Sequence, residues 1–140
     1  MVEKKKALHG SLNGKNVLGL VEIVQIIGLK RTVEAKALID SGASRSSVDM
    51  RIAAKAGLGP IVSTSRVKCR SESKGWTRRP IVKGELVLHG LRKKARFALA
   101  DRSEMACPVL IGRDIIHPDF VIDVGKSHES RKIKDEKKPT

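Results

Sequence analysis

Most of the chain between residues 17 and 124 consists of short segments in which apolar residues, many of them β-branched, alternate with polar ones. Alternation over four to eight residues is typical of strands that bury one face. The segments that we expect to form strands are 17–24, 33–39, 61–68, 80–88, 94–100, 109–111 and 120–124. Many short strands with little helix predict an all-β fold, built as a compact barrel or sandwich.

Turn and cap residues mark the ends of several of these segments. Gly28 and the pair 30–31 fit a hairpin turn after the first segment, and His89 with Gly90 fits another. The one helix that the pattern predicts covers residues 49–56, with Gly57 as its candidate C-cap. We therefore expect one short helix among the strands.

Composition indicates one domain that folds without stabilising disulfide bonds or metal ions. The chain has 140 residues, of which 40% are hydrophobic, and this is enough to form a core. Cys69 and Cys107 form no CxxC pair and the four histidines lie far apart, so we expect no disulfide framework, no metal site and no cofactor. The N-terminus is charged, and the longest apolar stretch is interrupted by glycines and polar residues. These features predict a cytoplasmic protein that does not enter a membrane.

Positive charge is unevenly distributed over the chain. The formal net charge is +14, and twelve basic residues against three acidic ones lie between Arg66 and Arg102. Residues 1–16 and 126–140 each carry a net charge of +3, and we expect them to be tails that flank a domain at 17–125. With three aromatic residues and no tyrosine, the chain is poorly suited to stack on single-stranded nucleic acid, although phosphate contacts remain open.

The most informative motif is an apolar strand that ends in Asp40-Ser41-Gly42-Ala43. The strand would support the Asp40 carboxylate, Gly42 would allow a sharp turn, and the Ser41 hydroxyl could hold the loop. For the tripeptide alone, which is common, the favoured interpretation is a plain turn in which Asp40 bonds its own backbone. A second apolar strand at 109–111, followed by Gly112-Arg113-Asp114, favours a functional interpretation.

The two motifs, in this order, resemble those of the retropepsin-like aspartic proteases. The chain is most similar to a small bacterial and archaeal family often labelled "ATP-dependent zinc protease", which is associated with glutamate ligases. Further matching segments are Arg79-Pro80-Ile81-Val82, the run from Leu99 to Met105, and the run from Phe120 to Val124. The resemblance covers about residues 17 to 127 and implies a single-lobe retropepsin-like barrel.

The resemblance also implies roles for individual residues. Asp40 would be one half of a catalytic carboxylate pair, and a homodimer would supply the second Asp40. Ser41, Gly42, Ala43 and Gly112 would support the catalytic loop, and Arg113 would brace it. Retroviral members carry a carboxylate four residues after the catalytic Asp, whereas this chain has Ser44 there. Arg113 therefore needs another partner, and Asp114 and Asp49 are the candidates.

The two cofactors in the family label are not supported by the sequence. No set of zinc ligands and no phosphate-binding glycine loop can be found in the chain. We therefore expect neither zinc nor ATP to take part.

The segment 72–76 lies where retropepsins carry the flap, the hairpin that closes over the substrate. Trp76 could be a lid residue or could cover the edge of the core, and Arg78 and Arg79 are candidate substrate-binding residues. We expect Cys107 to be a buried small residue and Met105 to belong to the core.

Two functions from different classes remain. The first is a homodimeric aspartic endopeptidase that acts on peptides, with a preference for acidic, glutamate-rich ones. Clustered Arg and Lys would attract such substrates. The alternative is a non-catalytic basic module of the same fold that binds RNA, the ribosome or an acidic protein.

Overall fold

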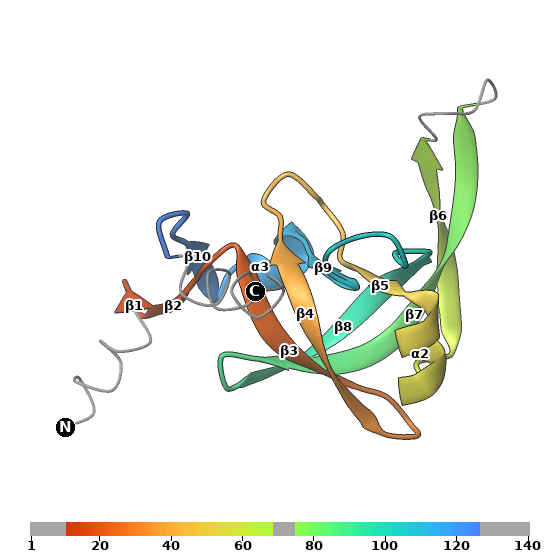
Figure 1. Cartoon of the computed structure of the whole chain (residues 1–140), viewed down its shortest axis with the longest axis horizontal. Helices are drawn as coiled ribbons and strands as arrows, with labels where there is room; N and C mark the ends of the chain where they lie inside the picture. Colours follow the sequence, from red (N-terminus) through yellow and green to blue (C-terminus); the bar gives the residue numbers. More distant parts are fainter. Residues whose placement is uncertain (1–10, 69–74, 127–140) are drawn as a thin grey trace, which may run out of the picture.

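The structure is a computed structural model, and it describes residues 11–68 and 75–126. Within these ranges the chain is mostly strand, with two short helices (Figure 1). The elements, in chain order, are β1 (Ser11–Leu12), β2 (Lys15–Leu18), β3 (Val21–Ile27), β4 (Thr32–Ile39), β5 (Ser47–Asp49), α2 (Met50–Ala56), β6 (Ile61–Lys68), β7 (Trp76–Leu88), β8 (Leu91–Ala100), β9 (Val109–Ile111), α3 (Arg113–Ile116) and β10 (Phe120–Ile122).

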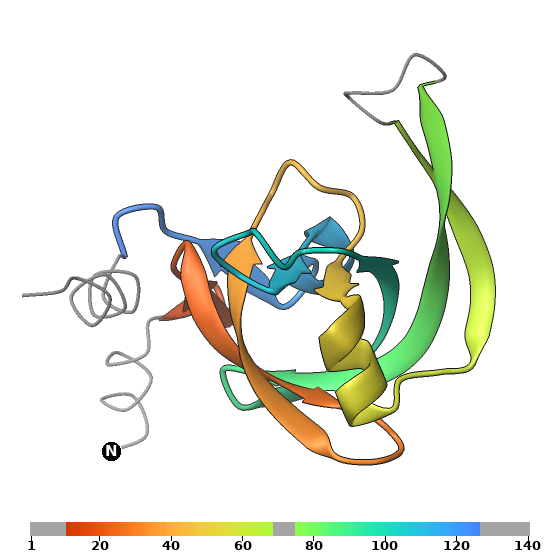
Figure 2. The same cartoon turned by 45° about the vertical axis from the view of Figure 1, so that its right-hand side comes forward.

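Six strands close into a barrel. The larger sheet has the order β3-β4-β9-β5-β8-β7-β6, and β3 also pairs with β7, which joins its two sides. β6 pairs only with β7, so this hairpin extends away from the barrel (Figure 2). A smaller sheet, β1-β2-β10, lies beside the barrel. The prediction of an all-β barrel is confirmed.

The alternation of the sequence determines the core. In β3, Glu22, Val24 and Ile26 are buried, while Ile23 and Gln25 between them are exposed. Each fully buried large apolar side chain stabilises the fold by roughly 1.5–3 kcal/mol relative to an exposed one. The largest such side chains come from four barrel strands, from β2 and from α3: Phe97, Leu18, Ile26, Ile81, Leu86, Leu88, Ile111 and Ile115.

The predicted strand 17–24 is two strands, because the chain changes sheet at Gly19. The Gly19 amide donates to Glu22 Oε2 at 2.6 Å, and a Cβ at Gly19 would collide with the carbonyl oxygen of Lys126. This close approach lets β2 pair with β10 in the small sheet while β3 enters the barrel. The hairpin of β1 and β2 also takes in residues 11–16 of the predicted N-terminal tail.

The predicted helix is confirmed as α2, with the expected caps. The Asp49 side chain accepts from the Arg51 amide, and Gly57 ends the helix in the left-handed region at φ 77°. A second helix, α3, follows Gly112 and was not predicted, because its four residues are too few for a helical pattern. In the described part of the chain no helix is long and apolar enough to cross a membrane.

Met105 does not belong to the core, contrary to the prediction. Its side chain is 57% exposed in the loop between β8 and β9, where Asp101–Ser103 hydrogen bonds hold the backbone at the surface. Cys107, at the end of the same loop, is buried as predicted. Cys69 lies outside the described residues.

Candidate active site

Asp40 stands directly after β4, at the edge of a parallel strand pair. β4 pairs with β9 through Ile39 and Ile111, and the Asp40 amide donates to the Ile111 carbonyl oxygen at 2.8 Å. Since the strands run parallel, Asp40 and Gly112 leave the barrel side by side. The carboxylate is therefore carried by two buried strands and is itself half-buried.

The loop after Asp40 is a tight turn closed by its own backbone. Asp40 Oδ1 accepts the Gly42 amide at 2.9 Å, and the Asp40 carbonyl oxygen accepts the Ala43 amide at 3.2 Å. A Cβ at Gly42 would lie 3.2 Å from Oδ1, so a side chain there would crowd the carboxylate. Among the described residues Asp40 Oδ2 has no hydrogen-bond partner. This oxygen can therefore accept a hydrogen bond from a water molecule or a substrate.

Gly112 and Arg113 support this loop from the second strand. The Arg113 amide donates to the Ala43 carbonyl oxygen at 2.8 Å, and Arg113 Nη1 donates to the Ser41 carbonyl oxygen at 2.8 Å. A Cβ at Gly112 would lie 2.8 Å from the Ala43 carbonyl oxygen and 3.0 Å from that of Arg45. Only glycine allows the two motifs to approach this closely. The structure thus brings the two sequence motifs together, with Arg113 as the brace.

The prediction that Asp114 or Asp49 pairs with Arg113 is wrong. Asp114 is bonded to Ser46 instead, through the hydroxyl at 2.7 Å and the amide at 3.1 Å. Asp49 is bonded to Arg51, because its position as N-cap of α2 directs it into the helix start. The Ser41 carbonyl oxygen is the partner that Arg113 has in their place.

Asp49 connects α2 to the loop between β8 and β9. It receives two bonds from the Arg51 guanidinium at 3.0 Å and one from the Arg102 amide at 2.7 Å. The bond from Arg51 is the main reason that the pKa of Asp49 falls to about 2, against the opposing effect of burial. Arg51 also reaches Asp101 at 3.0 Å, so the network fixes the start of the loop between β8 and β9.

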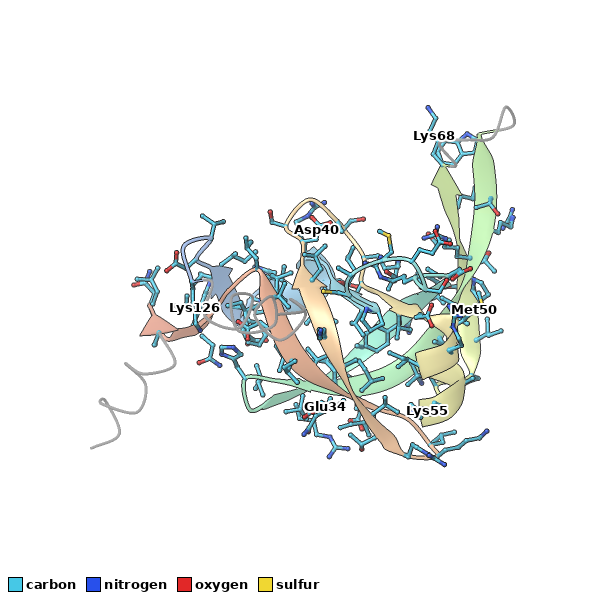
Figure 3. The ribbon with its side chains drawn as sticks, viewed as in Figure 1. Glu34, Asp40, Met50, Lys55, Lys68 and Lys126 are labelled. Carbon is cyan, nitrogen blue, oxygen red and sulfur yellow. The ribbon has the colours of Figure 1, made fainter. Side chains whose placement is uncertain are left out.

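The β6–β7 hairpin rises on the same side of the barrel as the Asp40 loop, opposite Glu34 and Lys55 (Figure 3). Trp76 is 54% exposed and lies under the Arg66 guanidinium, 4.8 Å from the ring centre, so it does not cover the core edge. Residues 72–74 of the predicted flap lie outside the described residues.

Arg78 and Arg79 point to opposite faces of this hairpin, because neighbouring strand residues alternate. Arg78 is exposed and donates to Thr64 Oγ1 at 3.1 Å. Arg79 is half-buried, and its charge lowers the pKa of Arg102 in the β8–β9 loop. Of the two candidate substrate-binding arginines, Arg79 is thus the one whose charge acts on Arg102.

Arg102 is a residue of the site that the sequence analysis did not single out. It is 9% exposed, and its Nε donates to the Cys107 carbonyl oxygen at 3.0 Å. Burial lowers its pKa, while Cys107 and, to a smaller extent, the carboxylates of Asp49 and Asp40 oppose this effect. The signal in the sequence was a charged Asp101–Arg102 pair directly after the alternating strand, close to the second motif.

A metal does not fit the described part of this region. Within residues 11–68 and 75–126, no three His, Cys, Asp or Glu side chains are grouped so that they could hold a metal ion.

A six-stranded barrel with an Asp-Ser-Gly loop on one strand and a Gly-Arg pair on the next defines the retropepsin class of fold. A family model described as RimB-like, "Retropepsin-like aspartic endopeptidase RimB", matches residues 52–133. This is more than half of the 140 residues, and the chain belongs to this family. The matched segment includes Gly112 and Arg113 and begins after Asp40.

Solved structures of low sequence identity have the same fold. Lpg0085 from Legionella pneumophila subsp. pneumophila str. Philadelphia 1, a DUF785 protein of unknown function, has a TM-score of 0.53 and 18% identity, covering 78% of this chain and 93% of its own. EIAV protease complexed with the inhibitor HBY-793 has a TM-score of 0.53 and 21% identity, with coverages of 69% and 83%. Simian foamy virus (mac) protease has a TM-score of 0.52 and 15% identity, with coverages of 86% and 99%. No curated protein matches the chain.

Proposed function

We propose that this protein is an aspartic endopeptidase that acts as a homodimer, with Asp40 of each chain forming the catalytic pair. The observation that carries the proposal is the position of Asp40. It lies at the end of a parallel strand pair, in a turn held by Gly42 and braced by Arg113. A merely structural turn does not require a brace from an arginine 72 positions further along the chain, and membership of an aspartic endopeptidase family supports the catalytic interpretation.

The dimer follows from the chemistry. Hydrolysis by paired carboxyls needs one charged and one protonated group, and this chain contains one Asp-Ser-Gly loop. A two-fold axis beside Asp40 would place the partner subunit's Asp40 opposite it, with both loops held in the same way.

In this mechanism the charged carboxylate takes a proton from a water molecule, whose oxygen then bonds to the carbonyl carbon of the peptide. The protonated carboxyl donates its proton to the carbonyl oxygen, so a neutral tetrahedral diol forms. The diol then returns one proton to a carboxylate as the carbon–nitrogen bond breaks. The departing nitrogen receives the other proton and leaves as an amine. The pair ends with one proton, as it began.

We propose acidic, glutamate-rich peptides as the preferred substrates. The Asp40 loop contains the exposed Arg45, and the strands of the projecting hairpin carry Arg66, Lys68, Arg78, Arg79 and Lys83 with no acidic residue in 61–68 or 75–84. Positive charge on both the Asp40 loop and the hairpin would attract an anionic chain and hold carboxylates. The resemblance to the family labelled "ATP-dependent zinc protease", which is associated with glutamate ligases, is consistent with this preference. Both the closer family and the preference stay predictions.

The same hairpin supports the second candidate, binding of RNA or ribosome. Its cations lie on an exposed ribbon beside Trp76, where they could contact phosphates. This function would use the hairpin and would not require Asp40.

The Asp40→Asn variant separates the two candidates. We expect it to abolish cleavage of a glutamate-rich peptide and to leave retention on a heparin column unchanged. The control is a charge reversal of Arg78 and Arg79 to Glu, which should reduce heparin retention. Cleavage that persists in a folded Asp40→Asn variant would overturn the peptidase proposal.

A further inference from the structure

The strands β7 and β8 carry a cluster of cations on the side that faces away from the core. In the antiparallel register of the two strands, Lys83 lies opposite Arg96, and Glu85 lies opposite Lys94. Opposed residues share a face of the sheet, as do residues two positions apart, while buried residues of β7 such as Leu86 point to the other side. The surface that we call the β7–β8 face consists of Lys83, Glu85, Val87, Arg92, Lys94 and Arg96.

The positive charge of the β7–β8 face is only partly compensated. Its one acidic residue, Glu85, accepts a hydrogen bond from Arg92 Nη2 at 2.7 Å. Within residues 11–68 and 75–126, the exposed side chains of Lys83, Lys94 and Arg96 form no ion pair. Lys83 and Arg96 are directly opposed like charges, an arrangement that destabilises a sheet. An anion bound between them would remove this repulsion.

Two of these cations border the same hollow. Lys83 and Lys94 line an open cavity of about 270 Å³, together with Leu29 from the turn between β3 and β4 and with Gly57 and Gly59 after α2. The parts of β7 and β8 next to their common turn run along the lower side of the barrel in Figure 1, whereas Asp40 is labelled at the upper side in Figure 3. The cations therefore converge on the side of the barrel away from the candidate active site.

The composition of the β7–β8 face favours nucleic acid over a protein as its partner. Protein–protein interfaces have an apolar core in which aromatic residues are enriched. The one apolar side chain of this face is Val87, which is half-buried. Interfaces with nucleic acid are more polar and much more positively charged, as this face is.

The arrangement of the face favours the backbone of an RNA double helix. None of its six residues is aromatic, so the face offers no surface on which unpaired bases can stack. Cations on a flat sheet face can contact the phosphates that border the wide, shallow minor groove of an RNA duplex. The major groove of B-DNA instead accommodates an inserted helix or ribbon.

We infer that the β7–β8 face binds the phosphate backbone of double-helical RNA, with Lys83, Lys94 and Arg96 each neutralising phosphate charge. This binding is independent of the catalytic interpretation of Asp40. It also uses a different surface from the β6–β7 hairpin, whose pairing ends at Val82. RNA bound to the β7–β8 face leaves the Asp40 loop uncovered, so RNA binding and peptide cleavage are compatible.

Titration of the full-length protein into a fluorescently labelled RNA duplex tests this inference. A duplex of about 16 base pairs has the length that a small double-stranded-RNA-binding domain spans. Anisotropy measured between about 0.05 and 0.2 M salt gives the slope of log K against log salt concentration, which reports the phosphates neutralised. We expect the triple variant Lys83→Gln, Lys94→Gln, Arg96→Gln to lose about tenfold or more in affinity at about 0.15 M salt. The magnitude of its slope should fall by about three, one for each cation.

The matched control removes the same charge from the projecting hairpin, through Arg66→Gln, Lys68→Gln and Arg78→Gln. At about 0.15 M salt the Debye length of about 8 Å screens charges that do not touch the RNA, so we expect this variant to lose less than about threefold in affinity. Thermal melting checks that both triple variants fold. Should the first of them fail to fold, Lys94→Gln alone tests the face, and the magnitude of its slope should fall by about one.

Several outcomes would overturn the inference. Equal losses in the two triple variants would show that overall charge, and not the β7–β8 face, determines binding. Equal affinity for the single strand, or for a DNA duplex of the same sequence, would contradict recognition of an RNA double helix. A glutamate-rich peptide that binds through the same three cations, where the RNA duplex does not, would identify an acidic protein segment as the occupant. The peptidase proposal is tested separately, by cleavage in the Asp40→Asn variant, and none of these outcomes changes it.

Discussion

Ser46 and Asp114, 68 positions apart, are joined by two hydrogen bonds, one from the Ser46 hydroxyl at 2.7 Å and one from its amide at 3.1 Å. The same hydroxyl oxygen accepts the Gly112 amide at 2.8 Å. One fully buried side chain thus fastens the Asp40 loop to the Gly112–Arg113 motif. In this chain, with Ser44 where retroviral members carry a carboxylate, this link and the Arg113–Ser41 bond hold the loop.

Replacing Ser46 with Ala should loosen this connection. The change leaves the Gly112 amide without its acceptor and removes one of the two donors to Asp114, at a cost of about 1–3 kcal/mol. We expect a lower free energy of unfolding in urea, together with a reduced rate of peptide cleavage. Ser44→Ala, an exposed change in the same loop, is the control and should alter stability by less than about 0.5 kcal/mol. Equal stabilities of the two variants would contradict the role of Ser46.

Acid should destabilise the protein through Asp49. Its pKa is lowered from 3.8 to about 2, so its contribution to stability is fully present above pH 3.8 and is lost as the pH falls toward 2. Thermal melts from pH 5 to pH 2 should therefore show a falling melting temperature, and Asp49→Asn should lower it at neutral pH and flatten this part of the curve. An unchanged slope in the variant would show that other carboxyl groups cause the acid sensitivity.

Peptide cleavage should have a bell-shaped dependence on pH. One Asp40 of the dimer must be charged while its mate is protonated, so the active form is lost in both acid and base. The measurement is kcat/KM for one neutral peptide, which keeps the charge of the substrate constant. A rate that rises to a plateau and does not fall again would contradict a shared proton.

Much of the fold could be predicted because burial follows the alternation of the sequence. The strands around Val24 and Phe97 and the capped helix ending at Gly57 are local features. The division at Gly19 was missed, because it depends on the distant carbonyl of Lys126. The strand β5 was missed as well, since its three residues are too few to show the alternation of apolar and polar residues that marks a strand.

For the site, the sequence identified the two motifs but not how they are fastened together. Asp40 and Arg113 belong to recognisable motifs, and their proximity follows from parallel pairing of β4 with β9. The partners of Arg113 and of Asp114 could not be predicted, because a hydrogen bond between loops depends on tertiary position. Arg102 was missed for the same reason, since a charged residue after a strand is usually exposed.

The central claim is that each active site needs two Asp40 carboxyls from two chains. The most direct test is to add inactive Asp40→Asn protein to a fixed amount of unmodified protein, after exchange of subunits at a concentration that keeps all chains dimeric. At equal amounts we predict that cleavage falls to about half, because random pairing leaves half of the active chains opposite a variant. An unchanged rate, with exchange verified by labelled subunits, would show that one Asp40 is sufficient and would contradict the paired-carboxyl account.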